Sequence, residues 1–283
     1  MPKYDYILFD ADNTPCGQPH GGPSDFNLSP GRSESALGSG ALAPPHHTAG
    51  PRYDFVLFDA DNTLFDFDAA EHRALTRTLE HYGFPCDDHT RERYLDINRA
   101  LWAAFDKGEA DKDWLVVERF AALQRELGGS NDSSEMNTYY LARLGECADL
   151  LPGAEELCRT LAKECTLAII TNGVASAQRG RFSRSPLREV IPFLFISGEM
   201  GCQKPQKVFF DKVLAEMNIT DPSRAVVVGD SLSADIQGAV NAGLDSIWYN
   251  PNGVPLGDGP RPTHIMCRFS DISSAILDCA KIC

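Results

Sequence analysis

Two aspartates separated by one residue stand at the end of an apolar run, and the chain carries this arrangement twice. Residues 4–14 read YDYILFDADNT, and residues 53–63 read YDFVLFDADNT. One carboxylate of such a pair can attack phosphorus as a nucleophile and form an aspartyl-phosphate. The other can pass a proton to the leaving oxygen and then take one from water. In the second copy, the pattern therefore predicts phosphoryl transfer by Asp59 and Asp61.

Only one copy of this motif can fill a given position in a sheet. The second copy continues directly into an apolar and helical pattern. The first copy, residues 1–14, is followed by residues 15–52, which are rich in Gly, Pro, Ser and Ala and are predicted to form a disordered linker. Because closing a linker costs entropy, we expect the second copy to be catalytic. If the first copy took the central strand, Asp10 and Asp12 would have these roles.

Short apolar runs alternate with helical patterns after about residue 151. Such runs have no polar alternation, which indicates parallel strands buried on both faces. The predicted fold class is therefore α/β, a Rossmann-like doubly wound parallel sheet, whose ligands collect at the carboxyl ends of the strands. Besides the strand that begins at Tyr53, the predicted strands are 166–170, 193–197, 225–228, 246–249 and 264–268.

Polar residues follow these strands, at the edge where the carboxyl ends of parallel strands meet. Asp230, after the Val-Val-Val strand, can complete an oxygen-ligand site for Mg²⁺ beside Asp59 and Asp61. Thr171 offers a hydroxyl and strand-end N–H groups to phosphate oxygens. Lys204, at a helix N-terminus, adds positive charge where the helix dipole already favours an anion. The sequence therefore predicts a phosphate and magnesium site at this edge.

Each motif also has an ordinary structural interpretation when taken alone. Asp-x-Asp-x-Thr often forms a turn or a helix cap, Thr-Asn-Gly a turn, and Gly-Asp a corner between a strand and a helix. Asp235 could be only a first-turn helix residue that is favourable to the dipole. The occurrence of all these motifs at successive strand ends favours a shared site over coincidence.

A helical pattern fills residues 66–150, between the second motif copy and the later strands. Leu75, Leu79 and Tyr82 share one face of a helix, and residues 114–127 form another helix by the same spacing. We expect an inserted all-helical domain. Its aromatic residues are predicted to form its core rather than a ligand platform: Trp102, Phe105, Trp114, Phe120, Tyr139 and Tyr140.

Four motifs, in order along the chain, resemble those of the haloacid dehalogenase-like (HAD) superfamily of phosphohydrolases. They are FDADNTLFDFD at residues 58–68, ITNGV at 170–174, Lys204-Pro205, and VVVGDSLSADIQGAVNAG at 226–243. The resemblance implies a HAD core domain made of residues 53–65 and 151–283. It also implies that residues 66–150 are a helical C1 cap that closes over the substrate.

The resemblance also assigns roles to individual residues. It implies that Asp59 is the nucleophile and Asp61 the general acid/base, as in a phosphatase or phosphomutase rather than a dehalogenase. The Mg²⁺ cofactor would be held by the Asp59 carboxylate, the Asp61 backbone carbonyl and Asp230. The remaining implied site residues are the phosphate-binding Thr171, Asn172 and Lys204 and the supporting Thr63, Gly173 and Asp235.

Longer stretches resemble the YjjG-type pyrimidine 5′-nucleotidases of this superfamily. They are FDADNTLFDF, AEHRAL, TNGVASAQRGRF and FISGEMGCQKP. The implied function is a Mg²⁺-dependent phosphomonoesterase that acts on pyrimidine nucleoside monophosphates through an aspartyl-phosphate. One alternative is a sugar-phosphate phosphatase or phosphomutase of the same superfamily. The other is an inactive phosphate-binding or interaction module, disabled by the N-terminal duplication.

Composition excludes several other classes of partner. The net charge of −14 argues against binding to nucleic-acid backbones, which requires clustered Lys and Arg. No apolar run approaches the roughly 20 residues of a membrane span, and we expect no signal peptide. Nine scattered cysteines without a Cys-x-x-Cys pair favour reduced thiols in a cytoplasmic protein. A small phosphomonoester is therefore the expected partner, and the oligomeric state stays open.

Overall fold

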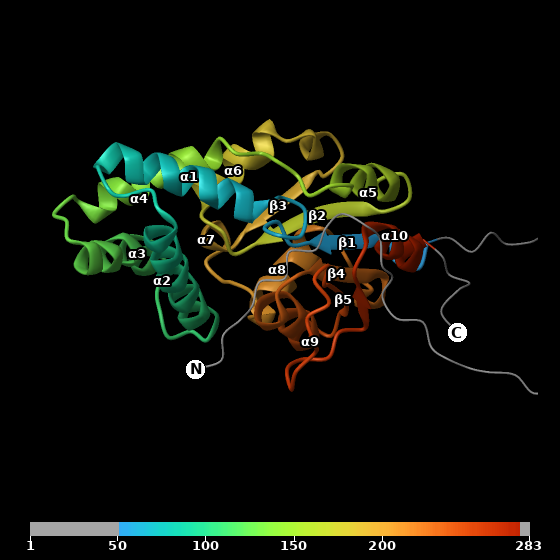
Figure 1. The fold of residues 1–283 in the computed structure, drawn as a ribbon. Coiled ribbons are helices and arrows are strands. Elements are labelled where there is room, and N and C mark those ends of the chain that lie inside the picture. The colour runs from blue at the N-terminus through green and yellow to red at the C-terminus, as the bar shows by residue number, and fades with distance from the viewer. Residues whose placement is uncertain (1–50, 278–283) are drawn as a thin grey trace, which may run out of the picture. The chain divides into compact units, whose positions relative to one another are not determined.

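A sheet of six parallel strands forms the centre of the computed structural model, which describes residues 51–277 (Figure 1). The strand order is β3-β2-β1-β4-β5-β6, so the direction of winding reverses between β1 and β4. Such a reversal is the point where ligands bind in open α/β sheets. The strands are β1 (Phe55–Phe58), β2 (Thr166–Thr171), β3 (Phe193–Ile196), β4 (Ala225–Gly229), β5 (Asp245–Tyr249) and β6 (His264–Met266).

The strands are apolar because both faces of the sheet are covered. All five residues of β4 are buried, and β2 is buried from its second residue onward. The predicted fold class is confirmed. Several strand bounds differ from the prediction by one or two residues. β3 ends at Ile196 because Ser197 begins the short helix α7 (Ser197–Met200), and the last strand ends at Met266. β2 and β4 each end one residue later than predicted, and β5 begins one residue earlier.

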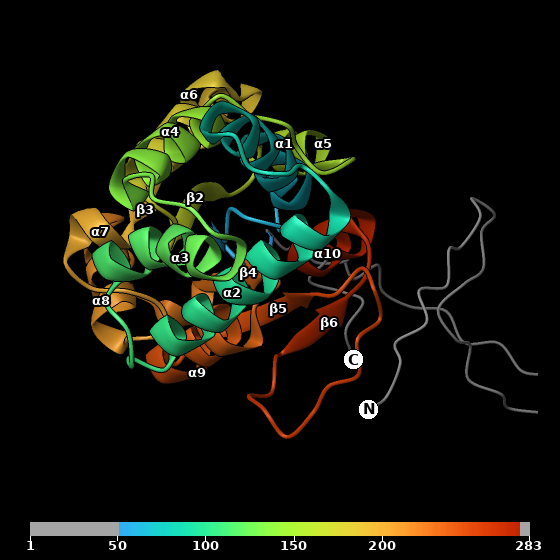
Figure 2. The ribbon, with the colours of Figure 1, turned by 60° about the vertical axis from the view of Figure 1, so that its left-hand side comes forward.

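Helices pack on the two faces of the sheet (Figures 1 and 2). On one face, α5 (Ala154–Leu161) and α10 (Phe269–Leu277) pack against alternate residues of β1, β2 and β4. On the other, α8 (Lys207–Glu216) and α9 (Gln237–Ala242) cover the remaining residues of the same strands. The other elements outside the insert are α6 (Ala175–Arg184), η1 (Pro186–Glu189), η2 (Pro222–Arg224) and the π-helix η3 (Leu232–Ile236).

Four helices between β1 and β2 form what we call the helical insert. They are α1 (Phe67–Tyr82), α2 (Asp88–Asp106), α3 (Lys112–Leu127) and α4 (Ser133–Gly145). Aspartate side chains accept hydrogen bonds from backbone N–H groups at the start of all four, which satisfies donors that a helix leaves open. The insert has its own apolar cluster, separate from the two that cover the sheet. The predicted division into core and cap, with its bounds at 66 and 150, stays a prediction.

The aromatic residues of the insert differ in how far they are buried. Phe120 and Tyr140 are fully buried and contact each other, and Phe105 is buried in a smaller cluster. The prediction was wrong for Trp114, whose exposed fraction is 53% because the next residue, Leu115, is the one that faces inward. Trp102 is only half-buried and lines the cavity between the insert and the sheet edge.

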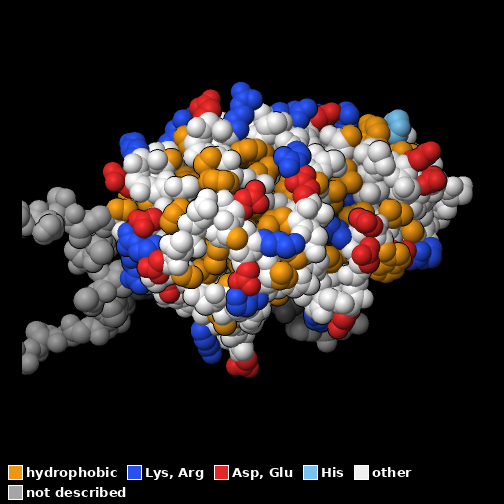
Figure 3. Space-filling view, turned by 180° about the vertical axis from the view of Figure 1, so that it is seen from behind, with side chains coloured by type: hydrophobic (Ala, Val, Ile, Leu, Met, Phe, Trp, Pro, Cys, Tyr) orange, Lys and Arg blue, Asp and Glu red, His pale blue; other side chains and the backbone are white. Residues whose placement is uncertain are grey.

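The first motif copy and nearly all of the predicted linker lie outside the described residues. The end of that linker, Pro51 and Arg52, contacts the core: the Arg224 guanidinium donates to both carbonyl oxygens, at 2.9 and 2.8 Å. Between residues 51 and 277, no helix has the length and apolar character needed to cross a membrane. On the face shown in Figure 3, acidic and basic side chains are interspersed, without a broad patch of one sign.

Candidate active site

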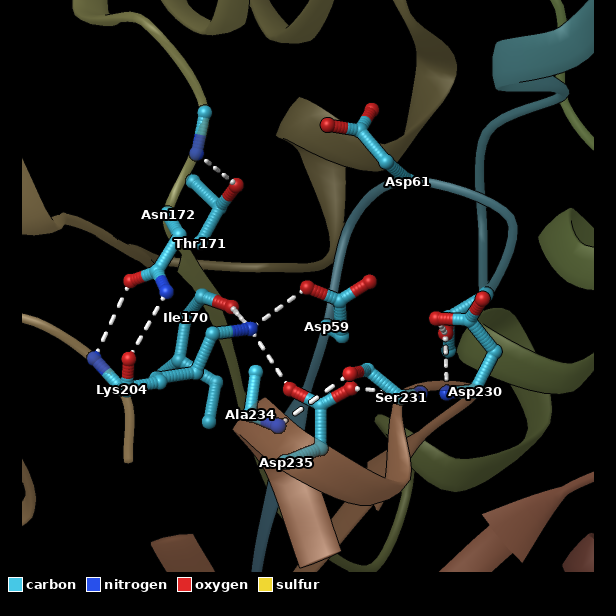
Figure 4. Close-up of polar contacts among 12 residues, drawn as sticks. Asp59, Asp61, Ile170, Thr171, Asn172, Lys204, Asp230, Ser231, Ala234 and Asp235 are labelled. Carbon is cyan, nitrogen blue, oxygen red and sulfur yellow. Dashed lines mark hydrogen bonds and ion pairs between the residues drawn. The ribbon is translucent and has the colours of Figure 1, made fainter. Parts of the chain in front are cut away.

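Asp59 follows the central strand β1 and is the focus of the polar residues at this edge. Its backbone N–H donates to the carbonyl of Val228 on the neighbouring strand β4, at 2.8 Å, which continues the sheet pairing. Its side chain is buried and accepts a hydrogen bond from Lys204 Nζ at 2.6 Å. The second motif copy therefore places one carboxylate at the topological switch point of the sheet (Figure 4).

Lys204 joins the ends of several strands through its ammonium group. Nζ donates to Asp59, to Asp235 Oδ1 at 2.6 Å, and to the backbone carbonyl of Ile170 at 2.9 Å. Burial lowers the pKa of this lysine, but the Asp235 and Asp59 carboxylates outweigh that effect and raise it overall. The ammonium therefore stays charged inside the protein. Sequence reasoning predicted Lys204 at this site but not its bond with Asp235.

The side chain of Asn172 forms two hydrogen bonds with the backbone of Lys204. Its Oδ1 accepts from the Lys204 N–H at 3.0 Å, and its Nδ2 donates to the Lys204 carbonyl at 2.9 Å. Figure 4 shows this pair of bonds between the loop after β2 and the segment before α8. The amide of Asn172 is thus occupied within the protein. Its role in phosphate binding stays a prediction.

Three carboxylates of this edge come close enough to share a cation. Oxygens of Asp59, Asp230 and Asp235 lie within 4.8 Å of one another. Burial raises the pKa of Asp59 well above its ordinary value, although Lys204 acts in the opposite direction. Burial and then Asp235 raise the pKa of Asp230 to about 7. Three ionised carboxylates would exceed the single positive charge of Lys204, and a hard divalent cation with oxygen ligands would compensate the excess.

Thr63 and Gly229 position two of these carboxylates. Thr63 Oγ1 accepts from the Asp230 N–H at 3.1 Å and lies 3.4 Å from Asp230 Oδ1. Gly229 ends β4, and a Cβ there would lie 2.2 Å from Asp235 Oδ2. Only glycine therefore leaves room for the Asp235 carboxylate against the end of β4. There the carboxylate also accepts a hydrogen bond from the Ser231 N–H, at 3.1 Å.

Asp61 points away from the other carboxylates in Figure 4. Gln178 Nε2 donates to its Oδ2 at 2.6 Å, and Arg181 Nη1 forms an ion pair with its Oδ1. Arg181 is fully buried, and its guanidinium lies over the rings of Phe65 and Phe67, 4.7 and 5.7 Å from their centroids. Both oxygens of the predicted general acid are thus occupied by residues of α6.

The loop after β2 packs closely against the side chain of Gln178. Thr171 Oγ1 accepts from the Gly173 N–H at 3.0 Å. A Cβ on Gly173 would lie 2.1 Å from Gln178 Nε2, so glycine is required for that side chain to reach Asp61. The predicted residues Thr171 and Gly173 are therefore brought beside the aspartates, as the strand-end argument expects.

Sequence reasoning missed four polar residues at this site. Lys112, the first residue of α3, donates to the Asn172 carbonyl at 2.7 Å and to Ser197 Oγ at 2.6 Å, and burial lowers its pKa to about 8. Asp106, at the end of α2, accepts from Ser233 Oγ at 2.8 Å. The other two are Gln178 and Arg181 of α6: the stretch TNGVASAQRGRF contains both, but its resemblance gave neither of them a role, and no motif marks Lys112 or Asp106.

A cavity of 230 Å³ connects this edge with the helical insert. The core contributes Asp59, Asp61, Thr171, Lys204 and Asp230 to its wall. The insert contributes a mostly apolar wall with a few polar groups, formed by Phe67, Asn98, Trp102, Asp106, Arg119, Leu141 and Leu144. This combination is typical of a small-molecule site. The cavity can hold a molecule whose reacting group meets the carboxylates and whose remainder meets the insert.

Comparison with known proteins identifies the family. Residues 53–243 match the sequence model of the haloacid dehalogenase-like hydrolases. The chain belongs to this family. The matched residues include Asp59, Thr171, Lys204 and Asp230, so the region that matches the family contains the polar edge of the sheet.

Curated relatives of this HAD-like hydrolase include two named as pyrimidine 5′-nucleotidases. PynA of Streptococcus pneumoniae is 36% identical over 218 residues, which cover 77% of this chain and 90% of PynA. YjjG of Escherichia coli is 32% identical over 214 residues, which cover 76% of this chain and 93% of YjjG. The predicted resemblance is confirmed at the level of the family and of these relatives.

A solved structure supports the fold assignment of the hydrolase. The HAD-hydrolase YfnB of Bacillus subtilis, crystallised with bound magnesium, matches with a TM-score of 0.74 and 35% identity. The match covers 78% of this chain and 97% of YfnB. The L-2-haloacid dehalogenase of Xanthobacter autotrophicus has a TM-score of 0.61 at 18% identity, which shows the shared fold alone.

Proposed function

We propose that this hydrolase is a phosphomonoesterase that releases phosphate from pyrimidine nucleoside 5′-monophosphates. The observation that carries the proposal is the position of Asp59: a buried carboxylate at the switch point, bonded to Lys204 and open to the cavity that the insert covers. The names of PynA and YjjG support the choice of a pyrimidine nucleotide as substrate.

The chemistry that this geometry supports has two balanced steps. A carboxylate oxygen of Asp59 attacks phosphorus, the bond from phosphorus to the 5′ oxygen breaks, and Asp61 gives its proton to that oxygen. Asp61 then takes a proton from water as the water oxygen attacks phosphorus, which releases inorganic phosphate and restores the Asp59 carboxylate. The Asp61 side chain must turn from Gln178 and Arg181 toward the leaving oxygen to do this.

Lys204 and the loop after β2 bind and orient the phosphoryl group in this proposal. The Lys204 ammonium already lies on Asp59, where it offsets negative charge at the nucleophile. Thr171 and the loop residues Asn172 and Gly173, at the carboxyl end of a parallel strand, line the same cavity as the Asp59 carboxylate. These groups would hold the phosphoryl oxygens while Asp59 attacks.

The oxygen-rich donor set fits Mg²⁺. Asp59 and Asp230 would hold the ion together with the backbone carbonyl of Asp61, and Asp235 would act through Lys204, to which it is bonded. Bound there, the ion would supply positive charge between an anionic nucleophile and an anionic phosphate. Magnesium in YfnB supports this choice of metal.

A cytoplasmic location is part of the same proposal. The cysteines that the structure describes, six in number, are all free thiols, which suits a reducing compartment.

A substrate panel tests the function. Phosphate release is measured with Mg²⁺ from nucleoside monophosphates, sugar phosphates and a sugar bisphosphate, on the full chain and on a version that starts at Arg52. We expect the highest kcat/KM for pyrimidine nucleotides. A preference for sugar phosphates would overturn the substrate assignment. Turnover in the shorter version alone would show that the N-terminal duplicate inhibits the enzyme, and no release from either would overturn the enzyme assignment.

A further inference from the structure

Arg119 is a buried cation of the helical insert that no sequence motif marks. Its exposed fraction is 3%, and its guanidinium lies 4.4 Å from the centroid of the Tyr140 ring. Its nitrogens donate to three neutral acceptors: the Val116 carbonyl at 3.0 Å, Asn98 Oδ1 at 3.3 Å and Asn137 Oδ1 at 2.8 Å. The side chain is therefore fixed in one orientation by α2, α3 and α4.

These bonds leave part of the guanidinium unused. An arginine has five N–H donors, and the three acceptors take three of them, so the hydrogen bonds within residues 51–277 leave one N–H on each terminal nitrogen. Within residues 51–277, no carboxylate oxygen lies within the 4.0 Å ion-pair distance of Arg119. A buried charge without a paired carboxylate is costly, and a ligand that accepts its free N–H groups would offset that cost.

Arg119 lines the same cavity as Asp59. Arg119 and Asn98 line its wall in the insert, and Asp59, Lys204 and Asp230 line its wall in the core. The wall also includes flat or aliphatic side chains: Phe67, Trp102, Leu141 and Leu144. A molecule in this cavity therefore meets carboxylates from the core, and apolar surfaces and hydrogen-bond donors from the insert.

We propose that Arg119, with Asn98, forms the subsite that binds the nucleobase, by donating hydrogen bonds to an oxo group of the pyrimidine ring. This inference rests on the proposed function, whose phosphate end it leaves unchanged. The planar ring fits between apolar side chains, and its oxo group accepts from the guanidinium. A site built to bond a polar group rejects analogues that lack it, because its own buried donors are then left without partners.

Glu71 explains why a neutral oxo group fits this subsite better than a carboxylate. Asn98 stands between the two charged residues: its Nδ2 donates to Glu71 Oε1 at 2.9 Å, and its Oδ1 accepts from Arg119. Burial raises the pKa of Glu71 to about 7, although the charge of Arg119 acts to lower it. A ligand carboxylate bonded to Arg119 would be repelled by ionised Glu71 on the other side of the Asn98 amide, whereas an uncharged acceptor would not be repelled.

The test compares two substrates on the same enzyme. The kcat/KM of the full chain is measured for uridine 5′-monophosphate and for ribose 5-phosphate, which has the phosphate and sugar but no base. For Arg119→Met, we expect kcat/KM for the nucleotide to fall at least about tenfold more than for ribose 5-phosphate. Their ratio does not depend on the fraction of enzyme that is folded, so a loss of stability cannot imitate the effect.

Two further variants sharpen the comparison. Arg119→Lys keeps the charge but not the planar set of donors, and we expect it to lose part of the same ratio. The matched control is Arg125→Met, on the same helix, whose side chain is 62% exposed and pairs with Glu118. We expect its substrate ratio to equal that of the unchanged protein.

Other outcomes would overturn the inference. Equal losses for both substrates in Arg119→Met would make Arg119 a structural residue only, while the proposed nucleotidase function would stand. An Arg119-dependent preference for phosphoglycolate, a carboxylate-bearing monophosphate, would assign the subsite to an anion instead. If the unchanged protein hydrolysed uridine 5′-monophosphate no better than ribose 5-phosphate, the proposed function would fail, and the inference with it.

Discussion

Two buried cations, Lys204 in the core and Arg119 in the helical insert, differ in what surrounds them. Lys204 bonds two carboxylates and a carbonyl. Arg119 bonds a backbone carbonyl and the side-chain oxygens of two asparagines, all uncharged. The charge in the core is therefore compensated within the protein without a substrate, whereas the charge in the insert is left with donors for a ligand. We infer that the residues of the core carry out the reaction and that the residues of the insert select the substrate.

The carboxylates of the two regions differ in the same way. Asp59 and Asp235 share the Lys204 ammonium directly, so removal of that cation leaves two buried acids without a compensating charge. Glu71 reaches Arg119 only through Asn98. Substitutions at these residues therefore test the contrast between the regions, from the largest expected effect to the smallest.

The largest expected effect is at the nucleophile. Asp59→Asn removes the attacking carboxylate but keeps the side chain's size, so we expect turnover to fall by at least about 10⁴-fold. Steady-state phosphate release with Mg²⁺ measures it. Asp211→Asn, on the exposed surface of α8, is the matched control and should keep full activity. Full turnover in Asp59→Asn would remove the chemical role that we assign to the core.

A smaller effect, on stability, is expected at the paired cation. Lys204→Met leaves the buried carboxylates of Asp59 and Asp235 uncompensated, so we expect the free energy of unfolding to fall by about 3–5 kcal/mol. Urea unfolding measures the change. Lys207→Met breaks an exposed pair and should change stability by less than about 0.5 kcal/mol. Similar values for both variants would contradict the contrast between the regions.

The pH dependence of stability tests the carboxylate of the insert. Burial raises the pKa of Glu71 from 4.5 to about 7, so the folded state binds more protons than the unfolded state between these values. Stability is therefore lost as the pH rises through this window. We expect Glu71→Gln to remove that loss and to stabilise the protein at pH 8, but not at pH 4, by up to about 3 kcal/mol.

Thermal or urea unfolding at several pH values measures the Glu71 effect. The matched control is Glu92→Gln, an exposed residue of α2, which should not change the slope of stability against pH. A pH slope that is the same in Glu71→Gln and in the unchanged protein would show that Glu71 has no raised pKa.

The smallest expected effect concerns the start of α3, which carries Lys112 toward the core. The Asp111 side chain accepts from the N–H groups of Asp113 and Trp114, at 2.9 and 3.2 Å. Asp111→Ala removes this cap, so we expect a loss of about 1 kcal/mol in urea unfolding. Asp111→Asn keeps an acceptor oxygen and should lose much less. Equal losses would mean that charge rather than capping stabilises this helix end.

The sequence by itself determined the strands that form the central sheet of the core. Continuous apolar runs predict parallel strands, and β1, β2 and β4 form with their polar residues at the carboxyl ends. Because parallel strands put their carboxyl ends on the same side of a sheet, the strand pattern alone assigns three site residues to one edge: Asp59, Thr171 and Asp230. The local sequence pattern was sufficient to place these residues at the edge of the sheet.

Only the tertiary structure decided which side chains pair. The bond of Lys204 with Asp235, and the bonds of Gln178 and Arg181 with Asp61, join segments that are 31 to 120 residues apart. Helical periodicity showed which positions of the insert are apolar, but it did not show that Trp114 is exposed or that Arg119 lines the cavity. Such contacts depend on how helices pack against one another, and sequence spacing along one helix holds no information about its neighbours.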